Sequence, residues 1–307
     1  MSDSRHTSRH TACPLDCPDA CSLTVDVRDG GVAAIAGDER NPLTAGLVCG
    51  KVRGFDKHRT SAERLRHPAV RVGDKGEGRF ARVTWDEALD RIANAMSDAK
   101  AKFGGESILP LSYGGSNGVL THGCVDSRLF YRLGASRLDR TVCAAPTSAA
   151  ATGLYGRMPG VALEDYVHAR LIVAWGVNPH ASGIHHVPVI KAAQAAGAKL
   201  IVVDPRRTGL AKMADVHLAV RPGTDLPLAL AVIHRLFEHG GADESFLAEH
   251  CTGAEELRRR AEAWPVARAA EACGVPAAHI EALADTWAST SPAVVRCGWG
   301  LERNRNG

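Results

Sequence analysis

Four cysteines near the N-terminus are spaced so that their thiols could hold one metal cluster. Three of them lie in the loop CPLDCPDAC and the fourth follows in VCGK, which gives the set Cys13, Cys17, Cys21 and Cys49. Iron–sulfur clusters of the 4Fe-4S type are held by cysteine thiolates. Pro14 and Pro18 disfavour a regular helix or strand here, and this leaves a loop that can wrap around a cluster. The spacing therefore predicts a 4Fe-4S cluster and a role in electron transfer.

Zinc binding and disulfide formation are the other uses that such cysteines could have. Structural zinc is the stronger alternative, although zinc sites usually combine two close cysteine pairs rather than a triplet and a single cysteine. Disulfides would need an oxidising compartment, and the opening segment MSDSRHTSRHTA contains no apolar signal sequence. We therefore expect a cytoplasmic protein and keep zinc as the alternative to iron.

A second group of residues could hold a nucleotide at the ends of two predicted strands. Gly176 ends the apolar run ARLIVAWG, and Asp204 ends the run KLIVVD just before Arg206. In open α/β sheets, ligands bind at the carboxyl ends of the strands, where glycine admits a phosphate and a carboxylate can hold a ribose or a base edge. Segment 223–225, Gly-Thr-Asp, lies at a predicted helix start and could do the same. The alternative in both segments is that the polar side chains only cap a turn or a helix.

Cys143 and Lys51 could also take part in chemistry. Cys143 lies in TVCAAP, ahead of a helix that we expect to begin near Thr147. A thiolate near a helix N-terminus is stabilised there and can bind a soft metal, whereas a buried, inert cysteine is the alternative. Lys51 follows the fourth cysteine of the N-terminal set by two residues. It could bridge a cluster to a neighbouring cofactor, or it could simply face solvent.

The elements that must position these residues follow from the apolar pattern. Segment 22–37 alternates as a β-hairpin does, with its turn at Asp29-Gly30-Gly31. Thr84 and Glu87 form a capping signal for a helix at 85–103 with an apolar face, and we expect a strand at 107–113 and a helix near 121–133. Apolar runs predict buried strands at 169–176, 199–205 and 293–300, with a helix at 190–197. Continuous apolar strands around a helix indicate a parallel sheet that is covered on both faces.

We therefore predict an α/β protein with a small β-rich iron–sulfur domain at its start. The expected domains are 10–62 (4Fe-4S binding), 63–140 (α/β) and 141–307 (Rossmann-like with a parallel sheet). The chain has 307 residues, 45% of them apolar and 23% charged, with a net charge of +3. The lack of a dense basic block with interleaved aromatic residues argues against nucleic acid as a partner. No apolar stretch is long enough to span a membrane.

Taken in order, these motifs resemble the molybdopterin oxidoreductases, the family of formate dehydrogenases, periplasmic nitrate reductases and dimethyl sulfoxide reductases. The resemblance covers the chain from about residue 11 to residue 307. Its segments are CPLDCPDAC, VCGK, RVTWDEALDRIA, the cysteine in TVCAAP, AWGVNP, VVDPRRT, ADVHLAVRPGTD and a late GWG. Several segments in the same order make the resemblance more specific than any single motif.

The resemblance implies cofactors and residue roles. The N-terminal cysteines would hold a 4Fe-4S cluster, Lys51 would relay electrons between cluster and pterin, and Cys143 would bind molybdenum or tungsten. The bis(molybdopterin guanine dinucleotide) cofactor would be cradled by Gly176, Asn178, Asp204, Arg206, Thr208, Gly223, Thr224 and Asp225. The implied reaction is a two-electron oxidation or reduction of a small-molecule substrate. Electrons would pass singly through the pterin and the cluster to a redox partner protein or subunit that is ferredoxin-, flavin- or NAD-linked.

Two departures from the family pattern limit what the resemblance implies. Formate dehydrogenases carry a histidine directly after the metal-binding residue, and Ala144 stands there in this chain. Formate oxidation therefore loses support, and oxygen-atom or hydroxyl transfer on another small substrate stays open. Family members are also longer, so we expect the chain to correspond to their N-terminal portion.

The alternative function is a molybdenum-free electron-transfer or scaffold subunit, like the large iron–sulfur subunit of respiratory complex I. Cys143 and the DPRRT and RPGTD segments argue against this alternative.

Overall fold

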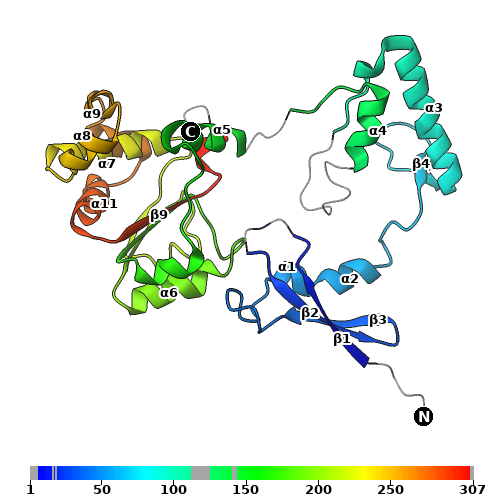
Figure 1. Ribbon diagram of the computed structural model, residues 1–307, viewed down its shortest axis with the longest axis horizontal. Helices are drawn as coiled ribbons and strands as arrows, with labels where there is room; N and C mark the ends of the chain where they lie inside the picture. The colour runs from blue at the N-terminus through cyan, green and yellow to red at the C-terminus, as the bar shows by residue number, and fades with distance from the viewer. Residues whose placement is uncertain (1–5, 16, 18, 112–124, 140–143, 305–307) are drawn as a thin grey trace. The chain divides into compact units, whose positions relative to one another are not determined.

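The computed structural model describes residues 6–15, 17, 19–111, 125–139 and 144–304. The chain divides into two compact units, Met1–Arg140 and Thr141–Gly307. The first unit carries strands β1 to β5 and helices α1 to α4, and the second carries strands β6 to β9 and helices α5 to α11 (Figure 1).

The first unit begins with a three-stranded antiparallel sheet in the order β1-β2-β3. Its strands are β1 (His6–Ala12), β2 (Ser22–Arg28) and β3 (Gly31–Gly37). Asp29 and Gly30 connect β2 to β3 with φ angles of 49° and 79°, as a type I′ turn requires. The predicted hairpin and its turn are thereby confirmed. Strand β1 is unexpected, because HTSRHTA has no apolar alternation and all of its residues are exposed.

The rest of the first unit is a short hairpin and helices. Its elements are α1 (Gly50–Arg53), α2 (Phe55–Thr60), β4 (Ala69–Arg71), β5 (Phe80–Arg82), α3 (Trp85–Phe103), η1 (Gly105–Ser107) and α4 (Val125–Leu133). Helix α3 begins as predicted, because the hydroxyl oxygen of Thr84 accepts a hydrogen bond from the backbone N–H of Glu87 at 3.2 Å. It ends at Gly104, whose φ is 86°, a conformation that favours glycine.

Two features of this region differ from the expectation. The strand predicted at 107–113 is wrong for its described part, since η1 extends to Ser107 and 108–111 form no strand. Pro110 offers no N–H to a strand ladder, which helps to explain the failure. The apolar face of α3 exists but is not buried, with Ile92 52% and Phe103 75% exposed. Residues 112–124, which hold the start of the helix expected near 121, lie outside the described residues.

The second unit is built on a four-stranded sheet in the order β8-β7-β6-β9, and every neighbouring pair in it is parallel. The strands are β6 (Leu171–Trp175), β7 (Lys199–Val203), β8 (Val216–Leu218) and β9 (Ala293–Cys297). Trp175, at the end of β6, pairs with Val203 on one side and Cys297 on the other. The predicted parallel sheet is confirmed, and its carboxyl ends meet at one edge.

Helices cover both faces of this sheet, and Figure 1 shows α6 and α7 on opposite sides of its strands. Leu171, Val173 and Trp175 of β6 point into one core and pack with α7, α10 and α11. Ile172 and Ala174 point into the other core, which α6 and η2 close. Each large apolar side chain buried in this way contributes about 1.5–3 kcal/mol. The helical elements are α5 (Ala144–Tyr155), η2 (Leu163–His168), α6 (His186–Ala195), α7 (Asp225–Glu238), α8 (Glu244–His250), α9 (Ala254–Glu262), α10 (Val266–Cys273), α11 (Ala277–Ser289) and η3 (Leu301–Arg303).

Among the helices in the described residues, none combines the length and the apolar character that a membrane span needs.

Candidate functional site

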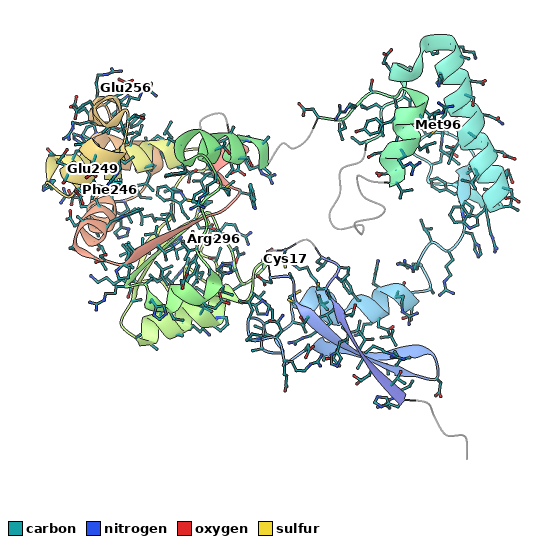
Figure 2. All side chains as sticks on the ribbon, viewed as in Figure 1. Cys17, Met96, Phe246, Glu249, Glu256 and Arg296 are labelled. Atoms are coloured by element: carbon teal, nitrogen blue, oxygen red, sulfur yellow. The ribbon has the colours of Figure 1, made fainter. Side chains whose placement is uncertain are left out.

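The loop that carries the first three cysteines closes the hairpin formed by β1 and β2. Ala12 pairs with Ser22 at the end of this ladder, and the N–H of Cys13 donates to the carbonyl of Cys21 at 2.8 Å. Cys13 and Cys21 are therefore held across from each other. Cys17 lies in the loop between them (Figure 2). The unexpected strand β1 thus fixes the distance between the two outer cysteines of the triplet.

A small apolar core brings Cys49 to this loop. Cys49 directly precedes α1, and its neighbours Val48 and Val52 are both buried. The core cluster consists of Cys21, Leu23, Val48 and Val52, and Cys13 and Cys49 pack against it. The fourth cysteine therefore lies beside the triplet because the side chains around it bury against β2.

Asp38 fixes the path of the chain between β3 and Cys49. Its carboxylate accepts two hydrogen bonds from the Arg40 guanidinium, at 3.0 and 2.9 Å, and lies 3.1 Å from Nδ1 of His10 on β1. The hydrogen bonds from Arg40 hold the pKa of the Asp38 carboxyl well below its usual range. The N–H of Asp38 also donates to the carbonyl of Ser22 at 3.0 Å. The segment that leads to Cys49 is thereby attached to the first two strands.

The other three thiols of the set lie close enough to Cys21 to affect its ionisation. Burial, the Asp19 carboxylate and the thiols of Cys13, Cys17 and Cys49 together raise the pKa of the Cys21 thiol to about 11. A thiol with this pKa is neutral near pH 7, and a bound cation is needed to deprotonate it and to offset the repulsion between thiolates. Four converging sulfurs therefore suit a metal centre, and this donor set fits a 4Fe-4S cluster as well as tetrahedral zinc.

Lys51 and Cys143 are the two other residues to which the resemblance gives a chemical role. Lys51 is exposed on α1, two residues after Cys49. Cys143 lies outside the described residues, and the helix that follows it, α5, begins at Ala144 rather than at the predicted Thr147. The roles of both side chains stay predictions.

The carboxyl ends of β6 and β9 are packed closely together. Gly176 follows β6 with a φ of 65°, and its N–H donates to the carbonyl of Val203 at 2.8 Å. Gly298 follows β9, and its N–H donates to the carbonyl of Trp175 at 2.8 Å. A side chain on Gly298 would collide with the carbonyl of Gly176. Both glycines are therefore needed where these two strands end.

Asp204 and Thr208 use their side chains to shape the turn after β7. One carboxylate oxygen of Asp204 accepts the N–H of Arg206 at 2.7 Å. The hydroxyl oxygen of Thr208 accepts the N–H of Ala211 at 3.2 Å, and both side chains belong to buried residues. These bonds are the capping that the sequence left as the alternative. A contribution of Asp204 and Thr208 to nucleotide binding stays a prediction.

Other side chains at this edge are left without partners, as a ligand site requires. The guanidinium groups of Arg206 and Arg207 are exposed, and neither forms an ion pair or side-chain hydrogen bond with any residue that the structure describes. The side-chain oxygen of Asn178 is buried and likewise lacks a partner within the described part of the chain. Two free cations and one free acceptor at the carboxyl edge fit a phosphate-bearing ligand with hydrogen-bond donors.

The segment that contains Gly223 and Thr224 is held by the end of α10. Nη1 of Arg221 donates to the carbonyl of Glu271 at 2.9 Å, and the Cys273 thiol donates to the carbonyl of Thr224 at 3.3 Å. Gly223 has a φ of 84°, and the Thr224 hydroxyl donates to the carbonyl of Arg221 instead of capping α7. Sequence reasoning missed Arg221 and Cys273, because no local pattern links the segment before α7 to the end of α10, about fifty residues further along the chain.

Asp225 is the first residue of α7, and its carboxylate is bound by a residue that sequence reasoning also missed. Nε1 of Trp175 donates to Oδ1 of Asp225 at 2.7 Å. Trp175 is the last residue of β6 and only 6% exposed. A buried tryptophan at a strand end usually finds a partner for its N–H, and this rule could have singled it out.

Residues 301–304 lie beside both glycine turns of the edge. A methyl group placed on Gly176 would lie 3.0 Å from the Leu301 side chain, and one on Gly223 would lie 3.7 Å from the Asn304 side chain. This segment thus borders the same edge as the turns after β6 and before α7. Sequence reasoning gave it no role.

Two family models match the chain. Residues 7–60 match the molybdopterin oxidoreductase Fe4S4 domain, and residues 64–307 match the molybdopterin oxidoreductase model. These matches overlap the cysteine set and the parallel sheet respectively. The boundaries proposed at 62 and 140 stay predictions.

Relatives and a solved structure agree with these matches. The probable oxidoreductase YoaE of Bacillus subtilis (strain 168) is 36% identical over 297 residues, which are 97% of this chain and 44% of YoaE. Dimethyl sulfoxide reductase DmsA of Escherichia coli (strain K12) is 30% identical, over 97% of this chain and 41% of DmsA. The structure of acetylene hydratase from Pelobacter acetylenicus superposes with a TM-score of 0.76 at 29% identity, covering 96% of this chain and 40% of the hydratase. The predicted α/β fold class is confirmed, and the chain spans less than half the length of these relatives.

Proposed function

Because the chain belongs to the molybdopterin oxidoreductase family, we propose that it supplies the cluster-binding and pterin-binding parts of a molybdenum-dependent oxidoreductase. The two domains imply a 4Fe-4S cluster and a molybdopterin cofactor. When bound, these groups supply two-electron chemistry on a small substrate and single-electron transfer to a partner. The observation that carries the proposal is the convergence of four thiols around Cys21.

The residues of the first unit would hold the cluster. Cys13, Cys17, Cys21 and Cys49 provide the four thiolates. The Asp38 network on one side and the Val48–Val52 segment on the other keep the donors together. The β1–β2 ladder holds Cys13 and Cys21, the outer cysteines of the loop, in register.

The carboxyl edge of the second unit would hold the guanine dinucleotide form of the molybdopterin. The turns at Gly176 and Gly223 would border the ligand, and Arg206 faces solvent with a free guanidinium that can bind phosphate. Asp225 would bind the base, and the free oxygen of Asn178 would accept a ligand hydrogen bond. Asp204, Thr208 and Thr224 would act mainly by shaping the turns around the ligand.

Two further roles come from the family resemblance. Cys143 would be the protein ligand of molybdenum or tungsten. Lys51 would act as an electron relay from the cluster to the pterin. A replacement of Cys143 by Ala should abolish turnover, and unchanged turnover would instead favour the molybdenum-free scaffold alternative, which the comparisons do not support.

Metal analysis tests the cluster assignment. The chain is purified without oxygen, and iron, zinc and molybdenum are measured together with the visible spectrum. We expect about four irons per chain and a brown colour, with iron lowered by Cys21→Ser. Cys251→Ser is the matched control, because Cys251 is an exposed cysteine in the other unit. A colourless protein that contains zinc and no iron would contradict the cluster.

Turnover tests the reaction class. Reduced methyl viologen serves as electron donor with dimethyl sulfoxide as probe, because DmsA is a dimethyl sulfoxide reductase. Acetylene serves as the second probe, because the superposed structure is an acetylene hydratase. Substrate-dependent oxidation of the dye supports an oxidoreductase. Conversion of acetylene and water to acetaldehyde, without oxidation of the dye, would indicate a hydratase instead of an oxidoreductase.

The partner and the location belong to the same proposal. A redox partner protein or subunit, ferredoxin-, flavin- or NAD-linked, would exchange electrons with the cluster. The cytoplasm is the location that the sequence predicts.

A further inference from the structure

We infer that Trp175 is a positioning residue that orients the Asp225 carboxylate for recognition of a guanine base. The inference rests on the proposed guanine dinucleotide site, and it adds the element that gives this site its preference for guanine. It starts from a hydrogen bond between two side chains that lie fifty residues apart in the sequence.

The indole of Trp175 is a rigid donor. It is 6% exposed and belongs to the core cluster that also contains Leu228 of α7 and Leu283 of α11. Packing on this side of the sheet leaves the ring no room to turn. Its N–H therefore keeps a fixed direction, and Oδ1 of Asp225, at 2.7 Å, is fixed with it.

The rest of the Asp225 carboxylate remains available. Oδ2 has no hydrogen-bond partner in the part of the chain that the structure describes. A carboxylate has about four acceptor positions, so Oδ1 also keeps one after binding Trp175. Asp225 thus presents two acceptor oxygens side by side at the edge where the glycine turns of Gly176 and Gly223 lie.

Guanine has the complementary edge. Its N1–H and its 2-amino group are two donors side by side, and a carboxylate can accept both in a bidentate arrangement. Adenine places an acceptor nitrogen at the same position and has no 2-amino group. A carboxylate that was free to rotate would lose part of this preference, because a bidentate contact needs both oxygens in one plane with the base.

Nucleotide affinities measure the effect. GDP and ADP are titrated into the 307-residue chain and into the variants Trp175→Phe, Asp225→Asn and the double variant. We expect the unmutated chain to prefer GDP by about tenfold or more, as a charge-assisted hydrogen bond provides. Trp175→Phe should reduce this preference to about threefold or less through weaker GDP binding, with ADP affinity unchanged. The double variant should match Asp225→Asn, because Trp175 acts only through Asp225.

Trp287→Phe is the matched control. Trp287 packs against the same core, and its indole forms no hydrogen bond with another described residue. It should leave the ratio of GDP to ADP affinity unchanged. An equal loss of preference in Trp287→Phe would show that core packing, and not the hydrogen bond, sets the ratio, and would overturn the inference.

The outcomes separate this inference from the proposed function. If the unmutated chain shows no preference for GDP, the proposed guanine site is refuted, and the positioning role of Trp175 is refuted with it. A preference that Asp225→Asn abolishes and Trp175→Phe leaves intact would overturn only the positioning role. Should Trp175→Phe fail to fold, the five indole N–H signals of the unmutated chain give a second test by nuclear magnetic resonance. One of them should shift with GDP and not with ADP, and the same signal should move in Asp225→Asn; no such signal would overturn the inference.

Discussion

Replacing Gly298 by Ala should destabilise the second unit through the close contact between the ends of β6 and β9. The new methyl group would collide with the carbonyl oxygen of Gly176, and it would lie 2.7 Å from the carbonyl carbon of Gly176 and 2.8 Å from Cγ1 of Val177. Carbon atoms pack at about 3.5 Å or more, and the carbonyl oxygen of Gly176 lies closer to the new methyl group than its carbon does, so the Gly176 peptide must retreat by more than about 0.8 Å. This movement strains the hydrogen bond from Gly298 to Trp175, now 2.8 Å long.

The expected cost combines two effects. Overpacking by one methyl group costs about 1–3 kcal/mol, and a weakened backbone hydrogen bond adds about 1 kcal/mol. Gly298→Ala should therefore lower the free energy of unfolding by about 2–4 kcal/mol, which corresponds to a urea midpoint lower by about 1–2 M.

Urea titration followed by tryptophan fluorescence measures this difference, with Gly300→Ala as the control. Gly300 has a φ of −77°, and the nearest atom to its added methyl group would be the Gly176 oxygen at 3.9 Å. The control should therefore remain within about 0.5 kcal/mol of the unmutated chain. The reasoning is refuted if Gly298→Ala and Gly300→Ala unfold at the same urea concentration.

The remaining predictions concern the first unit. Thr84→Ala should lower the free energy of unfolding by about 1 kcal/mol in urea titrations, because the N–H of Glu87 loses its cap; Ser97→Ala on the exposed surface of the same helix should cost nothing. The pKa of Asp38 is lowered in the fold, so its carboxylate adds stability above its unfolded pKa of about 4, and this is lost as pH falls through the folded pKa. Asp38→Asn should therefore flatten the dependence of the thermal midpoint on pH below about pH 4, and an unchanged curve would contradict the role of Arg40. The Cys21 thiol, with a pKa of about 11, must lose its proton to bind metal, so the affinity for cobalt(II) in a spectroscopic titration should rise with pH. Cys21→Ser should lower the slope of log affinity against pH by about one, and a slope that stays the same would show that this proton is not released.

The sequence predicted those features that depend on local patterns. The β2–β3 hairpin follows from alternation and from Asp29-Gly30, and the cap of α3 follows from Thr84. The parallel sheet follows from apolar runs that are buried on both faces. In each case neighbouring residues in the sequence determine the structure directly, either through a local backbone conformation or through the spacing of the buried side chains.

The features that were missed depend on contacts between distant segments. Strand β1 is polar and is held by its ladder with β2, so no apolar period reveals it. The apolar face of α3 was visible in the sequence, but a pattern does not say what covers it, and Ile92 is 52% exposed. The hydrogen bond from Trp175 to Asp225 joins a strand end to a helix start, and only the folded sheet brings them together. For the candidate site, residue types were predictable from spacing, whereas the side chains that orient them were not.

The N-terminal module has a very small apolar interior, and its described core cluster has four buried members, one of which is Cys21. Domains of this size with so little interior usually depend on a cross-link or a metal to stay folded. A prosthetic group that joins Cys21 to Cys49 closes a loop of 28 residues (49 − 21 = 28), and on the scale of disulfides such a closure is worth about 3–4 kcal/mol. Oxidative loss of the cluster would then unfold the polypeptide around it. Chemical damage to the cluster would thus lead directly to proteolytic removal of the module.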